Sequence, residues 1–383
     1  DFAVVRYNTD GSLDTTFGTD ISGMVITDLS NNSNDYIRSV VIDSSDRIVI
    51  AGNSNANGSI DFAVVRYNEN GSLDTSFGTD ISGMVITDIS GGNDKAFSVV
   101  IDSSQRIVVA GRSYQGGILA IAVVRYNANG SLDTTFGTDI SGMVLTNFGD
   151  STHSEAFSVV IDSSDRIVVA GYTRTTSTYE NDFAVVRYLS TGALDTSFGT
   201  DISGMVFNDF SNNSYDRGHS VVIDSENRIV VAGYTNANGS YDFAVVRYNV
   251  NGSLDTSFGT SNNGIVITDL SNNSSDGAFS VVIDSSQRIV VAGYSAANGS
   301  NDFAVVRYNE NGSLDTTFGP DISGMVITDL VNNKSDKAYS VVIDSSGRIV
   351  VAGYTYNSTN GTNFEFAVVR YNTDGSLDTT FGP

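Results

Sequence analysis

The chain has 383 residues, no cysteine and a formal net charge of −24 at pH 7, from 44 acidic and 20 basic residues. Such a charge repels nucleic acid and anionic lipid, and the lack of cysteine excludes disulfides and thiol chemistry. The 38 glycines, 2 prolines and 40% hydrophobic residues are typical of β-strands joined by tight turns around a sizeable core, and we find no signal peptide or membrane-spanning run.

A repeat of about 60 residues runs through the whole chain. The segment FAVVRYN begins at Phe2 and returns, intact or lightly changed, at Phe62, Ile121, Phe183, Phe243, Phe303 and Phe366. A fixed period of this length is the signature of a repeat architecture. We therefore predict a single repeat array over residues 1–383, with a partial repeat at 1–35 and six blades that begin near residues 36, 96, 156, 218, 278 and 338.

Within one repeat the strands follow in a regular order. FSVVID (97–102) and RIVVAG (106–111) are joined by three residues, which predicts a tight hairpin. A loop of variable length leads to IAVVRYN (121–127), and an NxxG turn follows in which the glycine needs a positive φ. The fourth strand is either SLDTTFG (131–137) or GMVLTN (142–147), because both are compatible with a strand.

The strand pattern predicts an all-β, six-bladed β-propeller. The runs SVVI, IVVA and AVV are apolar on both faces, so these strands should be buried on both sides. Successive hairpins imply antiparallel sheets of about four strands, which is the construction of propeller blades. A parallel β-helix is the alternative, but its coils are usually shorter and contain no hairpins.

The two ends of the array carry the same segment. Phe2–Gly18 and Phe366–Gly382 are identical in sequence. One copy is enough to complete a blade begun at the other end, so the second would be displaced, lie at an edge or add to a neighbouring molecule as a strand. A chain cut from a longer array would show the same overlap.

The repeats resemble those of the delta-60 family, a bacterial β-propeller repeat. The resemblance lies in FAVVRYNTDGSLDTTFG and SVVIDSSDRIVIAG with their copies, and it covers essentially the whole chain, although the ISGMVITDL stretch departs from it. It implies a propeller in a secreted or surface-attached bacterial protein and no defined reaction.

Two kinds of recurring charged residue need an interpretation. The turn after FAVVRYN is similar to a calcium loop, and its acidic positions predict a calcium site at Asp10, Asp14, Asp374 and Asp378, with a plain β-turn as the alternative. We predict no other cofactor.

The arginines of RYN and of the hairpin are expected to pair with the LD and VID aspartates at strand ends, and an anion-binding ring of arginines is the alternative.

The loops after RIVVAG differ between repeats and are the candidate binding surface. They combine tyrosine with serine, asparagine and glycine, a composition typical of adaptable protein-binding surfaces and of sugar-stacking sites, although tyrosines packed at the loop base would look the same. The candidate ligand-binding residues are Tyr114, Tyr172, Tyr179, Tyr234, Tyr241, Tyr294, Tyr354 and Tyr356.

No catalytic residue is predicted. The two histidines, His153 and His219, stand at non-equivalent positions, and no pair of acids is distinguished from the rest. We expect a non-enzymatic, extracellular or cell-surface protein with a structural or adhesive role, for which terminal strand complementation is a route of self-assembly. The alternative is a lectin-like carbohydrate-binding propeller whose partners bind at the tyrosine loops.

Overall fold

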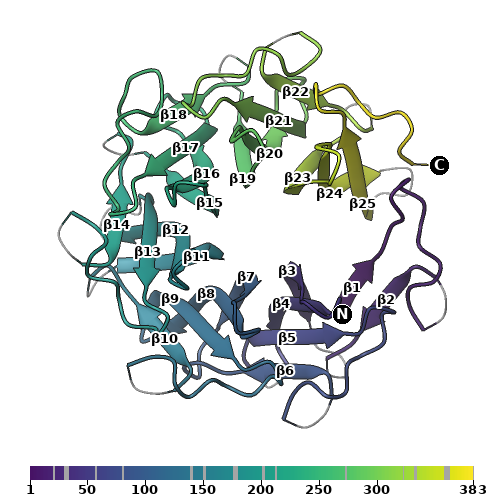
Figure 1. Ribbon diagram of the computed structural model, residues 1–383, viewed down its shortest axis with the longest axis vertical. Coiled ribbons are helices and arrows are strands. Elements are labelled where there is room, and N and C mark those ends of the chain that lie inside the picture. The colour runs from purple at the N-terminus through teal and green to yellow at the C-terminus, as the bar shows by residue number, and fades with distance from the viewer. Residues whose placement is uncertain are drawn as a thin grey trace. The chain divides into compact units, whose positions relative to one another are not determined.

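The computed structural model is all-β. It describes residues 1–383 except 20–21, 30–33, 57, 80–81, 139–140, 150–151, 176–179, 201–202, 212–213, 272–273, 322, 332–333, 358–362 and 383. The described residues form strands β1 to β25 in seven antiparallel sheets (Figure 1). Within that part of the chain no helix has the length and apolarity that a membrane span requires.

Five of the sheets have four strands, which lie side by side in chain order. The first sheet contains β3 (Asp35–Ile42), β4 (Ile48–Ser54), β5 (Asp61–Tyr67) and β6 (Met84–Thr87). The second contains β7 (Lys95–Ile101), β8 (Ile107–Gln115), β9 (Ile118–Tyr126) and β10 (Met143–Thr146). The third is β11 (Thr152–Ile161), β12 (Ile167–Thr175), β13 (Asp182–Tyr188), β14 (Met205–Asn208). The fourth contains β15 (Asp216–Ile223), β16 (Ile229–Thr235), β17 (Asp242–Tyr248) and β18 (Ile265–Thr268). The fifth contains β19 (Asp276–Ile283), β20 (Ile289–Ser295), β21 (Asp302–Tyr308) and β22 (Met325–Thr328).

The remaining two sheets contain the duplicated terminal segments. One has three strands, β23 (Asp336–Ile343), β24 (Ile349–Asn357) and β25 (Asn363–Tyr371), and the other pairs β1 (Phe2–Val5) with β2 (Met24–Thr27). The sheets of three and four strands are the blades of the predicted six-bladed propeller, and that prediction is confirmed. Both terminal copies pair within the chain, β1 with β2 and β25 with β24.

The order of strands in a blade follows the sequence pattern. The hairpin between FSVVID and RIVVAG is confirmed, with Gln105 at a φ of 63° closing its turn. GMVLTN supplies the fourth strand, whereas SLDTTFG contributes only a bridge between Leu132 and Tyr126. The second and third strands are buried along nearly their whole length, as β4 and β5 illustrate, which is why their apolar residues do not alternate.

Contacts within the chain define two units, which are described separately. Unit 1 comprises Asp1–Tyr179, Val185–Thr196 and Gly382–Pro383, and unit 2 comprises Glu180–Ala184 and Ser197–Phe381. In each unit the core lies between neighbouring sheets and is built from the second and third strands. Val49, Val109 and Val124 lie in one such cluster of unit 1, and Val230 and Val291 in one of unit 2.

The predicted arginine–aspartate pairs are confirmed. In the second copy Arg66 Nε lies 2.8 Å from Asp74 Oδ2, and its guanidinium lies 4.5 Å from the centroid of the Phe77 ring. In the hairpin Arg106 Nε lies 2.6 Å from Asp102 Oδ2. Because Arg66 also donates to the backbone carbonyl of Ala128 in the next repeat, these arginines hold repeats together.

Candidate functional site at the bulged ends of the first strands

Each blade has a β-bulge at the same position of its first strand. In β7, Ala96 pairs with Gly111 and Ser98 pairs with Ala110, so Phe97 is left between them. A bulge adds one residue to one strand and redirects its side chain. The bulged residues of the six blades are Arg38, Phe97, Phe157, His219, Phe279 and Tyr339.

The glycine of RIVVAG makes the bulge possible. A Cβ added to Gly111 would lie 2.0 Å from the carbonyl oxygen of Lys95, and one added to Gly293 would lie 1.9 Å from that of Gly277. Real Cβ atoms do not approach an oxygen so closely, so only glycine can face the bulged backbone. The sequence therefore fixes which residue of each blade is turned out of the sheet.

The bulged side chains form rows of aromatic contacts within each unit. In unit 1 the ring centroids of Phe97 and Phe157 are 5.1 Å apart, and the Arg38 guanidinium lies 5.7 Å from the Phe97 centroid. In unit 2 Phe279 lies 5.0 Å from His219 and 4.9 Å from Tyr339, measured between ring centroids. Rings at these distances pack as offset or edge-to-face pairs.

Most of the predicted tyrosines belong to these rows and are not free loop residues. Tyr172 is 4% exposed and donates a hydrogen bond to Glu155 Oε1 at 2.7 Å. Tyr234 packs on His219, and Tyr294 packs on Phe279. The half-buried members of the predicted set are Tyr234, Tyr241, Tyr294, Tyr354 and Tyr356.

Two further tyrosines of the predicted set differ from these. Tyr114, at the end of β8, is 43% exposed. Tyr179 lies outside the described residues. The bulged residues were not predicted as a group from the sequence, although each of them stands directly before the repeated SVV run.

Apart from Lys334, the basic residues outside the repeat motifs cluster at the same strand ends. They stand on the first strand before SVV or on the second strand after RIVVAG: Arg38, Lys95, Arg112, Arg174, Arg217 and Lys337. Arg112 forms an ion pair with Glu155, and the Lys337 Nζ lies 4.2 Å from the centroid of the Tyr294 ring. An otherwise strongly acidic chain thus presents cations beside aromatic rings at this end of its blades.

In unit 1 these residues line a cavity of about 390 Å³. Its wall includes Tyr36, Arg38 and Lys95, together with Asn34, Asn53 and Asn55. Tyr36 is 54% exposed, whereas Asn53 is 2% exposed. Burial, together with the charges of Arg112 and Arg38, lowers the pKa of Lys95.

One wall atom of this cavity has unused hydrogen-bonding capacity. Asn53 Oδ1 is buried and has no hydrogen-bond partner among the described residues. Nearby, Asn34 N donates to Asn55 Oδ1 at 2.7 Å, which holds the two amides together. The cavity therefore offers an acceptor, two cations, amide groups and a tyrosine ring to a polar, anionic ligand.

The residues predicted to bind calcium lie elsewhere and are hydrogen-bonded. Asp10 Oδ1 accepts from Ser12 N at 2.9 Å, and Asp374 Oδ1 accepts in the same way from Ser376 N at 2.9 Å. Asp14 Oδ2 lies 2.7 Å from Arg6 Nε. These contacts are those of a β-turn stabilised by aspartate, the alternative interpretation.

The last of the four, Asp378, is engaged in the same manner. Its Oδ2 lies 2.7 Å from Arg370 Nε, and hydrogen bonds from Thr380 and the arginine lower the pKa of Asp378 to about 2. Neither histidine adds a metal ligand set: His153 Nδ1 accepts from Leu119 N at 3.1 Å, and His219 belongs to the aromatic row.

Similar architectures occur among solved structures. A protein of unknown function from Dyadobacter fermentans DSM 18053 matches with a TM-score of 0.50 and 10% identity, over 88% of this chain and 96% of that chain. A polysaccharide lyase of family PL25, an ulvan lyase, matches with a TM-score of 0.50 and 10% identity, over 88% and 78% of the two chains. The same lyase bound to -[GlcA(1-4)Rha3S]- gives 0.51 and 11%, over 90% and 80%.

These neighbours contradict two of our expectations from the sequence. We expected a structural or adhesive role without catalysis, yet structures of this architecture include polysaccharide lyases. We had predicted no catalysis because the two histidines stand at non-equivalent positions and no pair of acids is distinguished from the rest. The cavity at Tyr36, Arg38 and Lys95 shows how non-repeated residues at the bulged strand ends make one blade junction unlike the others.

Comparison by sequence gives a family but no characterised relative. No curated protein matches the chain. The family described as "Domain of unknown function (DUF5122) beta-propeller" matches seven segments that together cover more than half of it: 1–17, 44–77, 105–136, 163–198, 225–258, 287–318 and 345–381. The predicted propeller repeat is thereby confirmed, although not under the delta-60 name, and the chain belongs to the DUF5122 β-propeller family.

Proposed function

We propose that this chain is a carbohydrate-binding propeller that recognises an acidic polysaccharide at the cavity lined by Tyr36, Arg38 and Lys95. The observation that carries the proposal is the meeting of an exposed aromatic ring with two cations in one cavity of about 390 Å³. The net charge of −24 repels anions at a distance, so an anionic ligand can be bound only through direct contacts with the cations of the cavity.

Each wall group has a role that suits an anionic sugar chain. The Arg38 guanidinium can hold a carboxylate or sulfate through two parallel hydrogen bonds, and Lys95 supplies a second cation. The apolar face of a sugar ring can stack on Tyr36. Asn53 Oδ1, buried and without a partner among the described residues, can accept a hydrogen bond from a sugar hydroxyl.

The structural neighbours support the same ligand class. The PL25 lyase was solved with a glucuronate- and sulfated-rhamnose-containing saccharide, which is an acidic polymer. A polymer of this kind is found outside cells, so the proposal also agrees with an extracellular or cell-surface location for this chain.

Calorimetric titration with acidic and neutral polysaccharides tests the proposal. We expect the wild type to bind a sulfated uronate polymer, and Arg38→Ala and Lys95→Met each to weaken binding about tenfold, since a hydrogen bond to a charged group is worth roughly 1.5–3 kcal/mol. Lys334→Ala, which removes a charge outside the cavity, is the matched control and should bind like the wild type. Equal affinity in all variants, or no binding by the wild type, would refute the proposal.

A second candidate is cleavage of the same polymer by β-elimination. Tyr36 carries a hydroxyl beside two cations in the cavity, and such cations can neutralise a uronate carboxylate and make the proton at C5 acidic. Tyr36 in its phenolate form takes that proton, a C4–C5 double bond forms, and the C4–O bond breaks. The Tyr36 hydroxyl formed in this way returns the proton to the leaving oxygen.

The two candidates are separated by the product. Elimination creates an unsaturated uronate that absorbs in the ultraviolet, so the absorbance of a polymer incubated with the protein should rise. Tyr36→Phe should abolish this rise and keep polysaccharide binding. A wild type that binds the polymer and leaves its absorbance unchanged is a binding protein only.

A further inference from the structure

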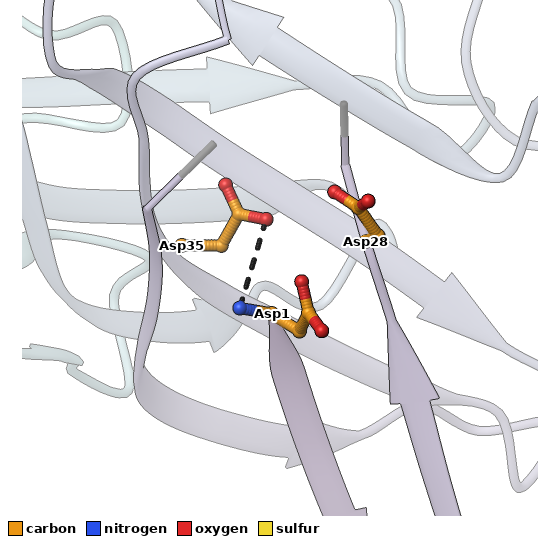
Figure 2. A group of neighbouring side chains, drawn as sticks. All are labelled: Asp1, Asp28 and Asp35. Carbon is orange, nitrogen blue, oxygen red and sulfur yellow. Dashed lines mark ion pairs between the residues drawn. The ribbon is translucent and has the colours of Figure 1, made fainter. Parts of the chain in front are cut away.

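The segment that leads from the fourth strand of one sheet to the first strand of the next is called a crossover here. Three aspartates meet at most of the crossovers. One lies at the start of the third strand, one directly follows the fourth strand, and one stands at the start of the next sheet's first strand. The triads are Asp1–Asp28–Asp35, Asp61–Asp88–Asp94, Asp182–Asp209–Asp216, Asp242–Asp269–Asp276 and Asp302–Asp329–Asp336, and in each of them one oxygen per carboxylate lies within 4.8 Å of the others. Figure 2 shows the first triad.

Backbone hydrogen bonds hold the crossover around the third aspartate. Asp94 N donates to the carbonyl oxygen of Ile60 at 2.6 Å, and Asp94 Oδ2 accepts from Ile89 N at 2.8 Å. The equivalent Asp336 Oδ2 accepts from Leu330 N at 2.9 Å. The third carboxylate is thus fixed beside the other two by the path of the chain.

A second observation shows that two of these carboxylates are incompletely satisfied. Asp94 and Asp336 are 0% exposed. Their Oδ1 atoms are buried and have no hydrogen-bond partner among the described residues. A buried anionic oxygen without a donor is costly, so each of these triads has room for a positively charged ligand.

The carboxylates of a triad also repel one another. In each triad one oxygen of every carboxylate lies within 4.8 Å of the others, so three negative charges share a small volume. A bound cation would offset this repulsion at neutral pH.

One crossover of the same chain lacks all three acids. Where β10 leads to β11, the corresponding residues are Ala120, Asn147 and Ser154. Ser154 Oγ there forms a hydrogen bond of 3.0 Å with Thr173 Oγ1. The crossover therefore forms without acids, and their joint loss is what a ligand shared by all three positions would produce.

We propose that the triads centred on Asp88 and Asp329 each bind one calcium ion. Calcium takes 6–8 oxygen ligands at 2.3–2.6 Å, so two of its ligands can be up to about 5 Å apart, which agrees with the spread of the triad oxygens. Water supplies the ligands that the carboxylates leave open. The ion fastens the end of one sheet to the start of the next.

The other triads are not assigned. Thr235 Oγ1 donates to Asp216 Oδ1, and Leu270 N donates to Asp276 Oδ2. In the first triad the nitrogen of Asp1 lies 4.0 Å from Asp35 Oδ2 (Figure 2).

Titration of the chelator-treated full chain with calcium tests the proposal. We expect calorimetry to give one ion per assigned triad, with saturation by roughly millimolar calcium, and calcium to raise the thermal unfolding temperature. Asp94→Asn and Asp336→Asn should each bind one ion fewer than the wild type. Asp46→Asn, an equal charge change in an exposed hairpin turn, is the matched control and should keep all the ions.

Building a new triad at the crossover that lacks the acids provides an independent test. Installing aspartate at Ala120, Asn147 and Ser154 together should add one calcium ion. A wild type that binds no calcium, or loss variants that bind as many ions as the wild type, would overturn the assignment. Because Asp336 lies outside the polysaccharide cavity, Asp336→Asn should leave polysaccharide affinity unchanged, so the two proposals fail separately.

Discussion

The glycine that ends RIVVAG illustrates how one residue decides the shape of a blade. At Gly293 the carbonyl oxygen of Gly277 occupies the place where a side chain would begin. The same approach recurs at Gly111 and at the equivalent glycine of each blade. The bulged residue, and with it the candidate site, depends on this contact between two backbones.

We predict that Gly293→Ala lowers the free energy of unfolding by about 2 kcal/mol or more, because overpacking of a closely packed site typically costs 1–3 kcal/mol. Urea denaturation measures the change. Gly149→Ala is the control: its Cβ would make only an ordinary contact of 3.6 Å with Thr152 Cγ2, so we expect a change within about 0.5 kcal/mol. Equal stability of the two variants would show that the bulge tolerates a side chain.

At the scale of elements, neighbouring sheets are joined by a buried hydrogen bond. The hydroxyls of Tyr126, at the end of β9, and Thr87, at the end of β6, are 2.7 Å apart. Tyr126 is 0% exposed, and burial raises the pKa of its hydroxyl. Tyr67 makes the same contact with Thr27, at 2.7 Å, so the third strand of one sheet repeatedly anchors on the fourth strand of the preceding one.

We predict that Tyr126→Phe and Thr87→Val each lower the free energy of unfolding by about 1–2 kcal/mol, because each leaves one buried hydroxyl without its partner. The double variant should cost less than the sum of the two, since neither partner then remains unsatisfied. A double-mutant cycle in urea measures the coupling, which we expect to be about 1 kcal/mol. Strict additivity would mean that the two hydroxyls do not stabilise each other.

At the scale of the whole molecule, the same ion pair recurs in every copy of the repeat. The paired atoms, arginine Nε and aspartate Oδ2, are 2.7–2.8 Å apart at Arg6–Asp14, Arg66–Asp74, Arg125–Asp133, Arg187–Asp195, Arg247–Asp255, Arg307–Asp315 and Arg370–Asp378. Acid therefore acts on all seven pairs together. The arginines that also donate to a backbone carbonyl of the next repeat include Arg6, Arg66, Arg125, Arg247 and Arg307.

The pKa of Asp74 shows in which direction acid changes the stability of the folded protein. Burial alone would raise the pKa of Asp74, but hydrogen bonds from Ser76 and Arg66 and the arginine's charge lower it overall. A carboxyl whose pKa is lower in the folded state stabilises the protein above its unfolded pKa of about 3.9, and loses that contribution as the pH falls through the folded value.

We predict that Asp74→Asn destabilises the protein by about 3 kcal/mol at pH 7, because it leaves a buried arginine without its partner. The difference from the wild type should shrink as the pH falls below about 4, since protonation then removes the same charge from the wild type. Urea denaturation at several pH values measures both. A difference independent of pH would show that the charge of Asp74 does not contribute.

The candidate site could be predicted only in part. The variable loops after RIVVAG lie at the end of the blades where the candidate cavity is found, but the predicted tyrosines are largely packed in the aromatic rows, as Tyr172 shows. Tyr36, Arg38 and Lys95 were not singled out because Lys95 belongs to a different blade from the other two and lies far from them in the sequence. Their meeting depends on the packing of β3 against β7.

The sequence by itself determined the repeat, the strands, the hairpins and the pairing of arginine with aspartate. These features rest on local periodicity and on residues few positions apart, such as Arg66 and Asp74. The tertiary structure decided the cavity and the aspartate triads. Asp61, Asp88 and Asp94 are separated along the chain by strands and turns, and only the closing of one sheet onto the next brings their carboxylates together.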